Sequence, residues 1–218
     1  MNWLWFHANA DLARWEVRPF SASVELSPRP RDKRDNHQRA VAIESPGLPE
    51  IDGPARRLAD AILRFDVFPS TLLTSVKRRP LVEVGDTIGL RYPFMPGLQL
   101  FFAARVIDRF EIVDDRQWRA GFTYRTLEGH PACGEETFSV EKDLATGQIT
   151  AALRSWSRPG TWLATLTYPL MRTLQVRAAR AALDHLQQIA NREEKAADLI
   201  TVSWPRRHVR ARLLSPWF

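Results

Sequence analysis

The sequence lacks most of the features that would place a protein in a specialised class. It has one cysteine in 218 residues, which excludes an intrachain disulfide framework and removes any need for an oxidising compartment. No apolar run reaches the roughly 18 residues that a membrane-spanning helix needs. The first seven residues have no basic region of the kind that opens a secretory signal. We therefore expect a cytoplasmic protein.

Motifs for nucleotides and nucleic acids are also missing. We find no internal repeat and no glycine-rich phosphate loop. The net charge of +6 could attract nucleic acid or anionic membrane, but the basic residues fall into separate clusters at 29–39, 77–79, 172–180 and 206–212. No helix-turn-helix, zinc-finger or RNA-recognition signature is visible. We expect no specific nucleic-acid partner and no cofactor, and the sequence leaves the oligomeric state unknown.

Apolar and aromatic side chains are abundant and are sufficient for a core, with 44% hydrophobic residues, 11 Phe and 8 Trp. The composition divides the chain into three parts. Residues 1–53 are expected to be an N-terminal arm and linker, because 27–39 are charged and almost free of apolar groups. Residues 54–192 are expected to form the folded domain, and residues 193–218 a basic, aromatic C-terminal tail.

Hydrophobic periodicity predicts one helix, a series of strands and a second, longer helix in this domain. The first helix begins at Pro54, with Asp52 as a possible cap, and stops at Pro69. Apolar spacings of three to five residues predict the long helix over 161–191, which Pro169 either kinks or starts. Strands are expected at 72–76, 87–92, 98–107, 110–113, 118–127, 136–142 and 148–156. This order predicts an α+β fold in which a curved antiparallel sheet wraps the C-terminal helix.

The stretch GHPACGEETF, residues 129–138, contains a histidine, the only cysteine and two adjacent glutamates. Side chains alternate along a strand, so Glu136 shares a face with the apolar Phe138 and Val140, whereas Glu135 points the other way. A buried carboxylate is costly unless it is paired or hydrogen-bonded. Glu136 is therefore expected to be held by arginine or backbone amides, to contact a ligand, or to take part in catalysis.

Metal binding and cysteine catalysis fit this stretch poorly. His130 and Cys133, with one or two glutamates, lack the paired Cys or His spacing of zinc sites. A cysteine nucleophile also needs a base and an orienting third group, and a histidine three residues away does not demonstrate that geometry. We expect no metal site.

The segments FTYRTLEGHPACGEETFSVEKD and ITAALRSWSRPGTWLATLTYPLMRTLQVRAARAAL closely resemble the family called domain of unknown function nineteen-ninety. The resemblance extends from about Pro54 to Leu186, but Arg125 stands where the family usually has glycine. It implies a START-like helix-grip fold, related to polyketide cyclases and pollen-allergen-type carriers, with an apolar cavity between sheet and helix. It implies no established activity. The matching positions are Tyr124, Thr126, Leu127, Gly129, His130, Pro131, Gly134, Glu135, Glu136, Phe138, Ser157 and Pro159.

Three functions remain open, and we favour the first. A non-enzymatic carrier would bind a small hydrophobic ligand or lipid in the cavity between sheet and long helix. A cyclase- or hydrolase-type enzyme would use Glu136, His130 and Tyr124 as acid-base groups. A peripheral membrane or interaction module would act through the Trp- and Arg-rich ends of the chain. The ligand-binding candidates are Tyr124, His130, Glu135, Glu136, Phe138 and Trp156.

The expectation of a carrier also depends on the supply of aromatic rings in the strands. These rings could line a cavity, but they could equally fill an ordinary core. They are Phe94, Phe101, Phe102, Phe122, Tyr124, Phe138 and Trp156.

Overall fold

The computed structural model describes residues 11–21, 32–95, 98–160 and 168–192. Its strands are β1 (Lys33–Ile43), β2 (Thr74–Val76), β3 (Thr87–Met95), β4 (Leu98–Val113), β5 (Gln117–Thr126), β6 (Ala132–Asp143) and β7 (Gln148–Pro159). Its helices are α1 (Ala13–Glu16), α2 (Pro54–Leu63) and α4 (Tyr168–Ala190). The strands form one antiparallel sheet in the order β1-β7-β6-β5-β4-β3-β2.

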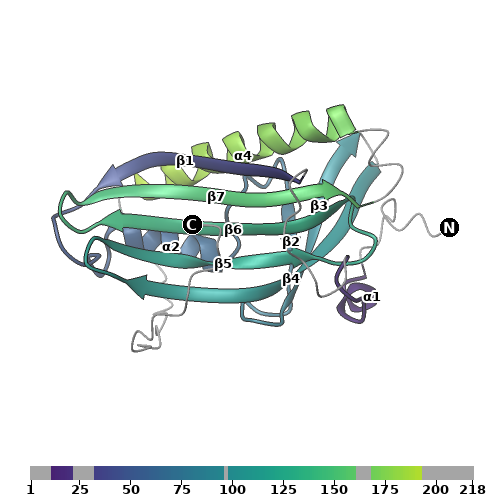
Figure 1. Ribbon diagram of the computed structural model, residues 1–218, viewed down its shortest axis with the longest axis horizontal. Coiled ribbons are helices and arrows are strands. Elements are labelled where there is room, and N and C mark those ends of the chain that lie inside the picture. The colour runs from purple at the N-terminus through teal and green to yellow at the C-terminus, as the bar shows by residue number, and fades with distance from the viewer. Residues whose placement is uncertain (1–10, 22–31, 96–97, 161–167, 193–218) are drawn as a thin grey trace.

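The sheet is curved, and α2 and α4 pack on its concave face (Figure 1). The expected α+β, helix-grip arrangement, in which a curved antiparallel sheet wraps the C-terminal helix, is therefore confirmed. The strands expected at 98–107 and 110–113 form one strand, β4, because a β-bulge between Val106 and Asp108 absorbs the change of register. No described helix is long and apolar enough to cross a membrane.

Strand β1 corrects the expected linker at 27–39. Residues from Lys33 onwards pair antiparallel with β7, starting at Ser157. Composition was misleading because β1 lies at the edge of the sheet, where charged side chains are tolerated and protect against unwanted strand pairing. Its inward polar side chains bind α4, with Asp35 paired to Arg172 and Arg39 paired to Asp184.

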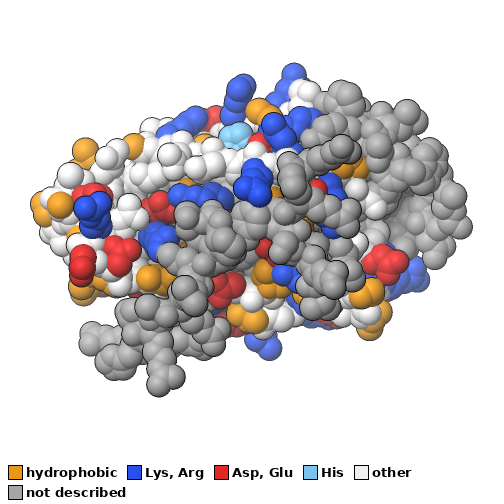
Figure 2. Space-filling view, in the orientation of Figure 1, with side chains coloured by type: hydrophobic (Ala, Val, Ile, Leu, Met, Phe, Trp, Pro, Cys, Tyr) orange, Lys and Arg blue, Asp and Glu red, His pale blue; other side chains and the backbone are white. Residues whose placement is uncertain are grey.

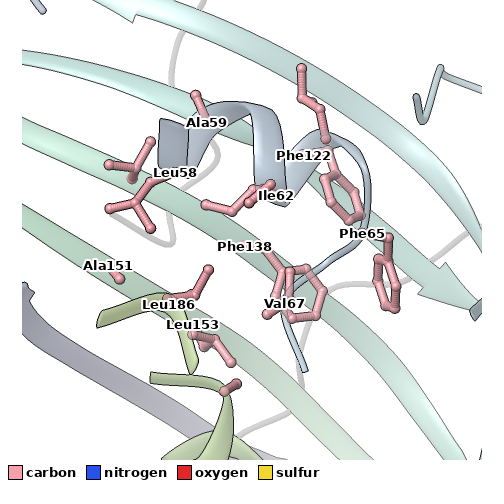
Figure 3. Close-up of a cluster of buried hydrophobic side chains, with 14 of the residues drawn as sticks. Leu58, Ala59, Ile62, Phe65, Val67, Phe122, Phe138, Ala151, Leu153 and Leu186 are labelled. Atoms are coloured by element: carbon pink, nitrogen blue, oxygen red, sulfur yellow. The ribbon is translucent and has the colours of Figure 1, made fainter. Parts of the chain in front are cut away.

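The core lies between the concave face and the two longer helices (Figure 3). Leu58 and Ile62 of α2, Phe122 and Phe138 of the sheet, and Leu186 of α4 are all fully buried. The rings of Phe122 and Phe138 lie 5.4 Å apart between centroids. Burial of such side chains, at about 25 cal/mol per Å² of apolar surface, is the main force that holds the helices on the sheet.

Helix α2 begins at Pro54 as predicted, but its N-terminal cap and its C-terminal end differ from expectation. Oε1 of Glu44, rather than Asp52, accepts a hydrogen bond from the first-turn amide of Ala55 at 2.7 Å. The helix ends well before Pro69, because Phe65 adopts a φ of 53°, in the left-handed region that terminates helices. Its ring packs 5.7 Å from that of Phe138, which compensates for this unusual conformation.

The long C-terminal helix is described from Tyr168 to Ala190, with Pro169 in its first turn. Proline is tolerated at this position because the first amides of a helix have no partner within it. The expected residues 161–167 lie outside the part of the chain that the structure describes.

A buried ion pair joins β6 to the start of α2. The ammonium of Lys142 donates to Oε2 of Glu44 at 2.6 Å, and the two side chains are 0% and 1% exposed. Lys142 also donates to the carbonyl of Leu48 at 3.2 Å. Its inward position could have been read from the sequence, because Lys142 has the same strand parity as Val140.

Loss of Lys142 should therefore destabilise the protein severely. Lys142→Met would leave the Glu44 carboxylate buried without its cation, which we expect to lower the free energy of unfolding by about 3–5 kcal/mol. Arg39→Met is the matched control, since Arg39 pairs with an exposed Asp184 and should lose no more than about 1 kcal/mol. Urea unfolding measures the free energy of unfolding of both variants. Equal losses would show that the buried ion pair contributes no more to stability than the exposed one.

Candidate functional site

The six residues predicted as ligand-binding candidates do not form one cluster, since the structure places them in three locations. Tyr124, Glu136 and Phe138 face the concave side, Glu135 and Trp156 face the convex side, and His130 lies in the turn between β5 and β6. Only the concave group lies on the face of the sheet that packs against α2 and α4.

Tyr124 and Glu136 form a direct pair on the concave face. They lie opposite each other on β5 and β6, and the Tyr124 hydroxyl donates to Oε2 of Glu136 at 2.6 Å. The inward direction of Glu136 is as predicted. The expected partner, arginine or backbone amides, is wrong, because the carboxyl binds a neutral phenol. The Glu136 residue is mostly buried and keeps a small accessible surface.

The surroundings of this pair shift the pKa values of both groups. Burial among protein atoms raises the pKa of Glu136 from 4.5 to about 7; the hydrogen bond from Tyr124 acts in the opposite direction, and the negative charge of Asp35 adds to the rise. Burial and the neighbouring carboxylate raise the pKa of Tyr124 well above its ordinary value. Glu136 is thus an acid that titrates near neutral pH, which is a property common at functional sites.

The pair belongs to a line of polar side chains that crosses four strands. Ser155 on β7 lies opposite Glu136, and Asp35 on β1 lies opposite Ser155. Directly opposed residues point to the same face, so Tyr124, Glu136, Ser155 and Asp35 form one row, here called the polar row. At its end, the Asp35 carboxylate pairs with the guanidinium of Arg172 on α4.

The polar row marks a boundary on the concave face. On one side lie Phe122, Phe138 and Leu153, which are opposite one another on β5, β6 and β7 and are buried in the core. On the other side, the positions next to the row on β6 and β7 are small, with Gly134 opposite Ser157. On β6 and β7, the concave face therefore changes from large apolar side chains to small residues at this row.

Glu135 and Trp156 are occupied by contacts on the convex face. Oε1 of Glu135 accepts from Nε of Arg125 at 2.7 Å, and its Oε2 accepts from the indole of Trp156 at 3.2 Å. Arg125 also lies over the ring of Phe20, 5.0 Å from its centroid. Figure 2 shows this side of the molecule, where basic side chains are interspersed with acidic ones. These contacts account for Glu135 without a ligand.

His130 does not join Tyr124 and Glu136. Its Nδ1 accepts from the amide of Ala132 at 3.0 Å, and its ring packs edge-on against Phe102 at 4.6 Å between centroids. Burial lowers the pKa of His130 to about 4, so the ring is neutral at physiological pH. Within the described chain, the ring makes no hydrogen bond to Tyr124 or Glu136.

The aromatic rings expected to line one cavity also divide between the two faces. Phe122, Tyr124 and Phe138 cluster with Phe65 on the concave side. Phe101 instead packs on Trp15 of α1, on the convex side. The side chain of Phe94 lies outside the described residues. Cys133 is buried and free, and the described residues contain no group of three or more side chains arranged to hold a metal.

Sequence reasoning missed the rest of the polar row. Ser155 shares strand parity with Leu153, so its inward direction was available from the same rule that placed Glu136. Asp35 gave no usable signal, because its strand was interpreted as a linker, and Arg172 could not be matched to it without the register of β1.

Comparison with known families places the chain in one of them. The sequence profile described as Domain of unknown function (DUF1990) matches residues 18–185, and the protein belongs to this family. The match begins well before Pro54 and so includes β1. A UPF0548 protein of Arabidopsis thaliana is 37% identical over 70 residues, which covers 30% of this chain and 34% of the relative. The chain thus matches about a third of that relative's length.

Solved structures with a similar backbone fold have low sequence identity to this chain. A hypothetical protein of Helicobacter pylori is 8% identical, with 72% of this chain and 86% of the other covered and a TM-score of 0.47. A truncated norcoclaurine synthase of Thalictrum flavum is 11% identical, with 75% and 96% covered and a TM-score of 0.42.

The raised pKa of Glu136 leads to a pH-dependent prediction. The folded protein holds this proton more tightly than the unfolded chain, so the stability from this group is present below pH 4.5 and is lost as the pH rises to about 7. Glu136→Gln removes the titration. The variant's free energy of unfolding relative to the parent should therefore rise by about 1–3 kcal/mol between about pH 4 and pH 8.

Urea unfolding at the two pH values measures this difference. Glu135→Gln is the matched control, because it makes the same chemical change at a carboxylate bound to Arg125, and it should show no such gain at high pH. A Glu136→Gln protein that becomes relatively less stable as the pH rises would contradict the assignment.

Proposed function

We propose that this protein binds a small hydrophobic ligand on the concave face, between the sheet and α4, with the polar end of the ligand at the polar row. One observation carries the proposal: Glu136 is a partly accessible carboxyl group on an inward, largely apolar face, and its hydrogen-bond partner is a phenol rather than a cation. Such a group is costly to keep in a folded protein, and a ligand that uses it supplies a reason to retain it.

The packing around the polar row favours a ligand at the row over a ligand elsewhere on the concave face. The part of the concave face under α2 is filled by the protein's own side chains, including Leu58 and Ile62. Beside the row, the partly buried Phe68 contacts Phe138 at 6.0 Å between ring centroids and presents an apolar surface. A ligand with an apolar body and one polar group fits an apolar wall that ends in polar side chains.

Adding a large side chain at the row tests the proposal without removing core packing. Ser155 is partly accessible and lies in the middle of the polar row, so Ser155→Trp should block a ligand there. We expect the affinity for a fluorescent apolar dye, measured by titration, to fall by about tenfold or more. Asn36→Trp is the matched control: it adds the same ring on β1, at an exposed position of the opposite face, and should leave binding unchanged.

Material carried through purification provides an independent check. Solvent extraction and mass spectrometry of the parent protein should recover a small apolar compound that is depleted in Ser155→Trp and retained in Asn36→Trp. A parent protein that binds no dye and yields no such compound would overturn the proposal, as would equal binding by the two tryptophan variants.

A second candidate function, acid-base catalysis, is favoured by the near-neutral pKa of Glu136. Such an enzyme would use Glu136 with Tyr124 and without His130, whose ring nitrogen is taken up by the Ala132 backbone. Incubation of a recovered ligand with the protein separates the two functions, since a carrier returns it unchanged. A role for the chain ends stays a prediction, because residues 1–10 and 193–218 lie outside the described residues.

A further inference from the structure

Two adjacent polar atoms of the row have no partner within the described chain. Oε2 of Glu136 accepts from Tyr124, but Oε1 makes no hydrogen bond to any described residue, and neither does the hydroxyl of Ser155. The two residues lie directly opposite each other on β6 and β7, and the Cβ atoms of residues in this relation are about 5 Å apart. A single group bound between them could reach both.

The charges around these atoms favour one kind of group. Asp35 places a second carboxylate next to Ser155 in the row, and its charge acts on Glu136. Arg172 from α4 is the cation at this end of the row, and it is engaged by the Asp35 carboxylate. A ligand carboxylate at Glu136 would therefore meet two acidic groups, whereas a hydrogen-bond donor would meet acceptors.

We propose that the ligand of the concave face carries a head group that donates hydrogen bonds, an amine or a hydroxyl, and that Glu136 and Ser155 bind it together. This inference rests on the proposed function, because it specifies the ligand of the same site. Ser155 then acts as a binding residue, and Tyr124 positions the Glu136 carboxyl by fixing its other oxygen. An anionic head group such as a fatty-acid carboxylate is selected against.

The affinity for a ligand with an amine head group should depend on pH. Only the ionised form of Glu136 pairs fully with an ammonium, and burial raises the pKa of this carboxyl to about 7. The charged or titratable groups that face it are Asp35 from β1, Tyr124 from β5 and Arg172 at the end of the row from α4. Affinity for an amine should therefore rise between about pH 6 and pH 8, whereas affinity for an alcohol should change less.

Three probes with the same apolar body test the head group directly: octylamine, octanol and octanoate. Their affinities for the full chain are measured at about pH 8 by displacement of an apolar dye. We expect octylamine to bind at least about tenfold more tightly than octanoate, which is the scale of one charge-assisted hydrogen bond. Glu136→Gln should bring the two affinities close together, because an amide both donates and accepts.

Glu135→Gln is the control, since it removes a carboxylate one residue away on the convex face and should preserve the preference for octylamine. Octanoate binding as tightly as octylamine, or an equal loss of preference in both variants, would overturn the head-group assignment while leaving a ligand site in place. Failure of the dye and of all three probes to bind would overturn the proposed function as well.

Discussion

The buried ion pair between Glu44 and Lys142 is the constraint on which the rest of the structure depends. Removing two charges from water is expensive, and the cost is offset only where direct bonds satisfy both groups. Here the Glu44 carboxylate binds Lys142 and the amide of Ala55, while the ammonium also binds the carbonyl of Leu48. Gly53 is required beside it, because a Cβ there would lie 2.4 Å from Oε1 of Glu44.

The ion pair between Glu44 and Lys142 determines which part of the concave face is covered by α2 and which part carries the polar row. It fixes the first turn of α2 against β6, and the helix then directs Leu58 and Ile62 into the sheet, where they fill one part of the concave face. The polar row lies across the same face, where Glu136, Ser155 and Asp35 are partly accessible and where Arg172 of α4 reaches β1. The site we propose thus lies beside the part of the concave face that α2 fills, and Tyr124 belongs to both the row and the core.

Much of the fold could be predicted from local sequence patterns, because the alternation of apolar and polar residues in strands and the residue preferences of turns act within a few residues. The β6–β7 hairpin, the inward direction of Glu136 and the start of α2 at Pro54 all follow from such patterns. Hydrogen bonds between residues far apart in sequence could not be predicted. The bond from Tyr124 to Glu136 depends on the register between β5 and β6, and the bond from the Ala55 amide to Glu44 depends on a loop that folds back. Strand β1 was missed because a charged edge strand resembles a linker in composition.

The family resemblance gave the fold but not the position of the site. It singled out His130, Glu135 and Glu136 together, and the structure assigns them three different environments: a turn, a convex ion pair and the concave row. Successive residues of a strand point their side chains to opposite faces of the sheet, so adjacent residues of a motif can have different surroundings. A motif of this kind therefore combines residues that shape the turn between β5 and β6 with residues, such as Glu136, that lie on the concave face.

The measurement that bears most directly on the central claim is a carbon-detected NMR titration of the Glu136 side-chain carboxyl in the intact protein. Our account predicts a midpoint near pH 7, and a still higher midpoint in Tyr124→Phe, because the phenol hydrogen bond favours the ionised carboxylate. A midpoint near 4.5 would mean that the carboxyl is well solvated, which would remove the observation that carries the proposed function.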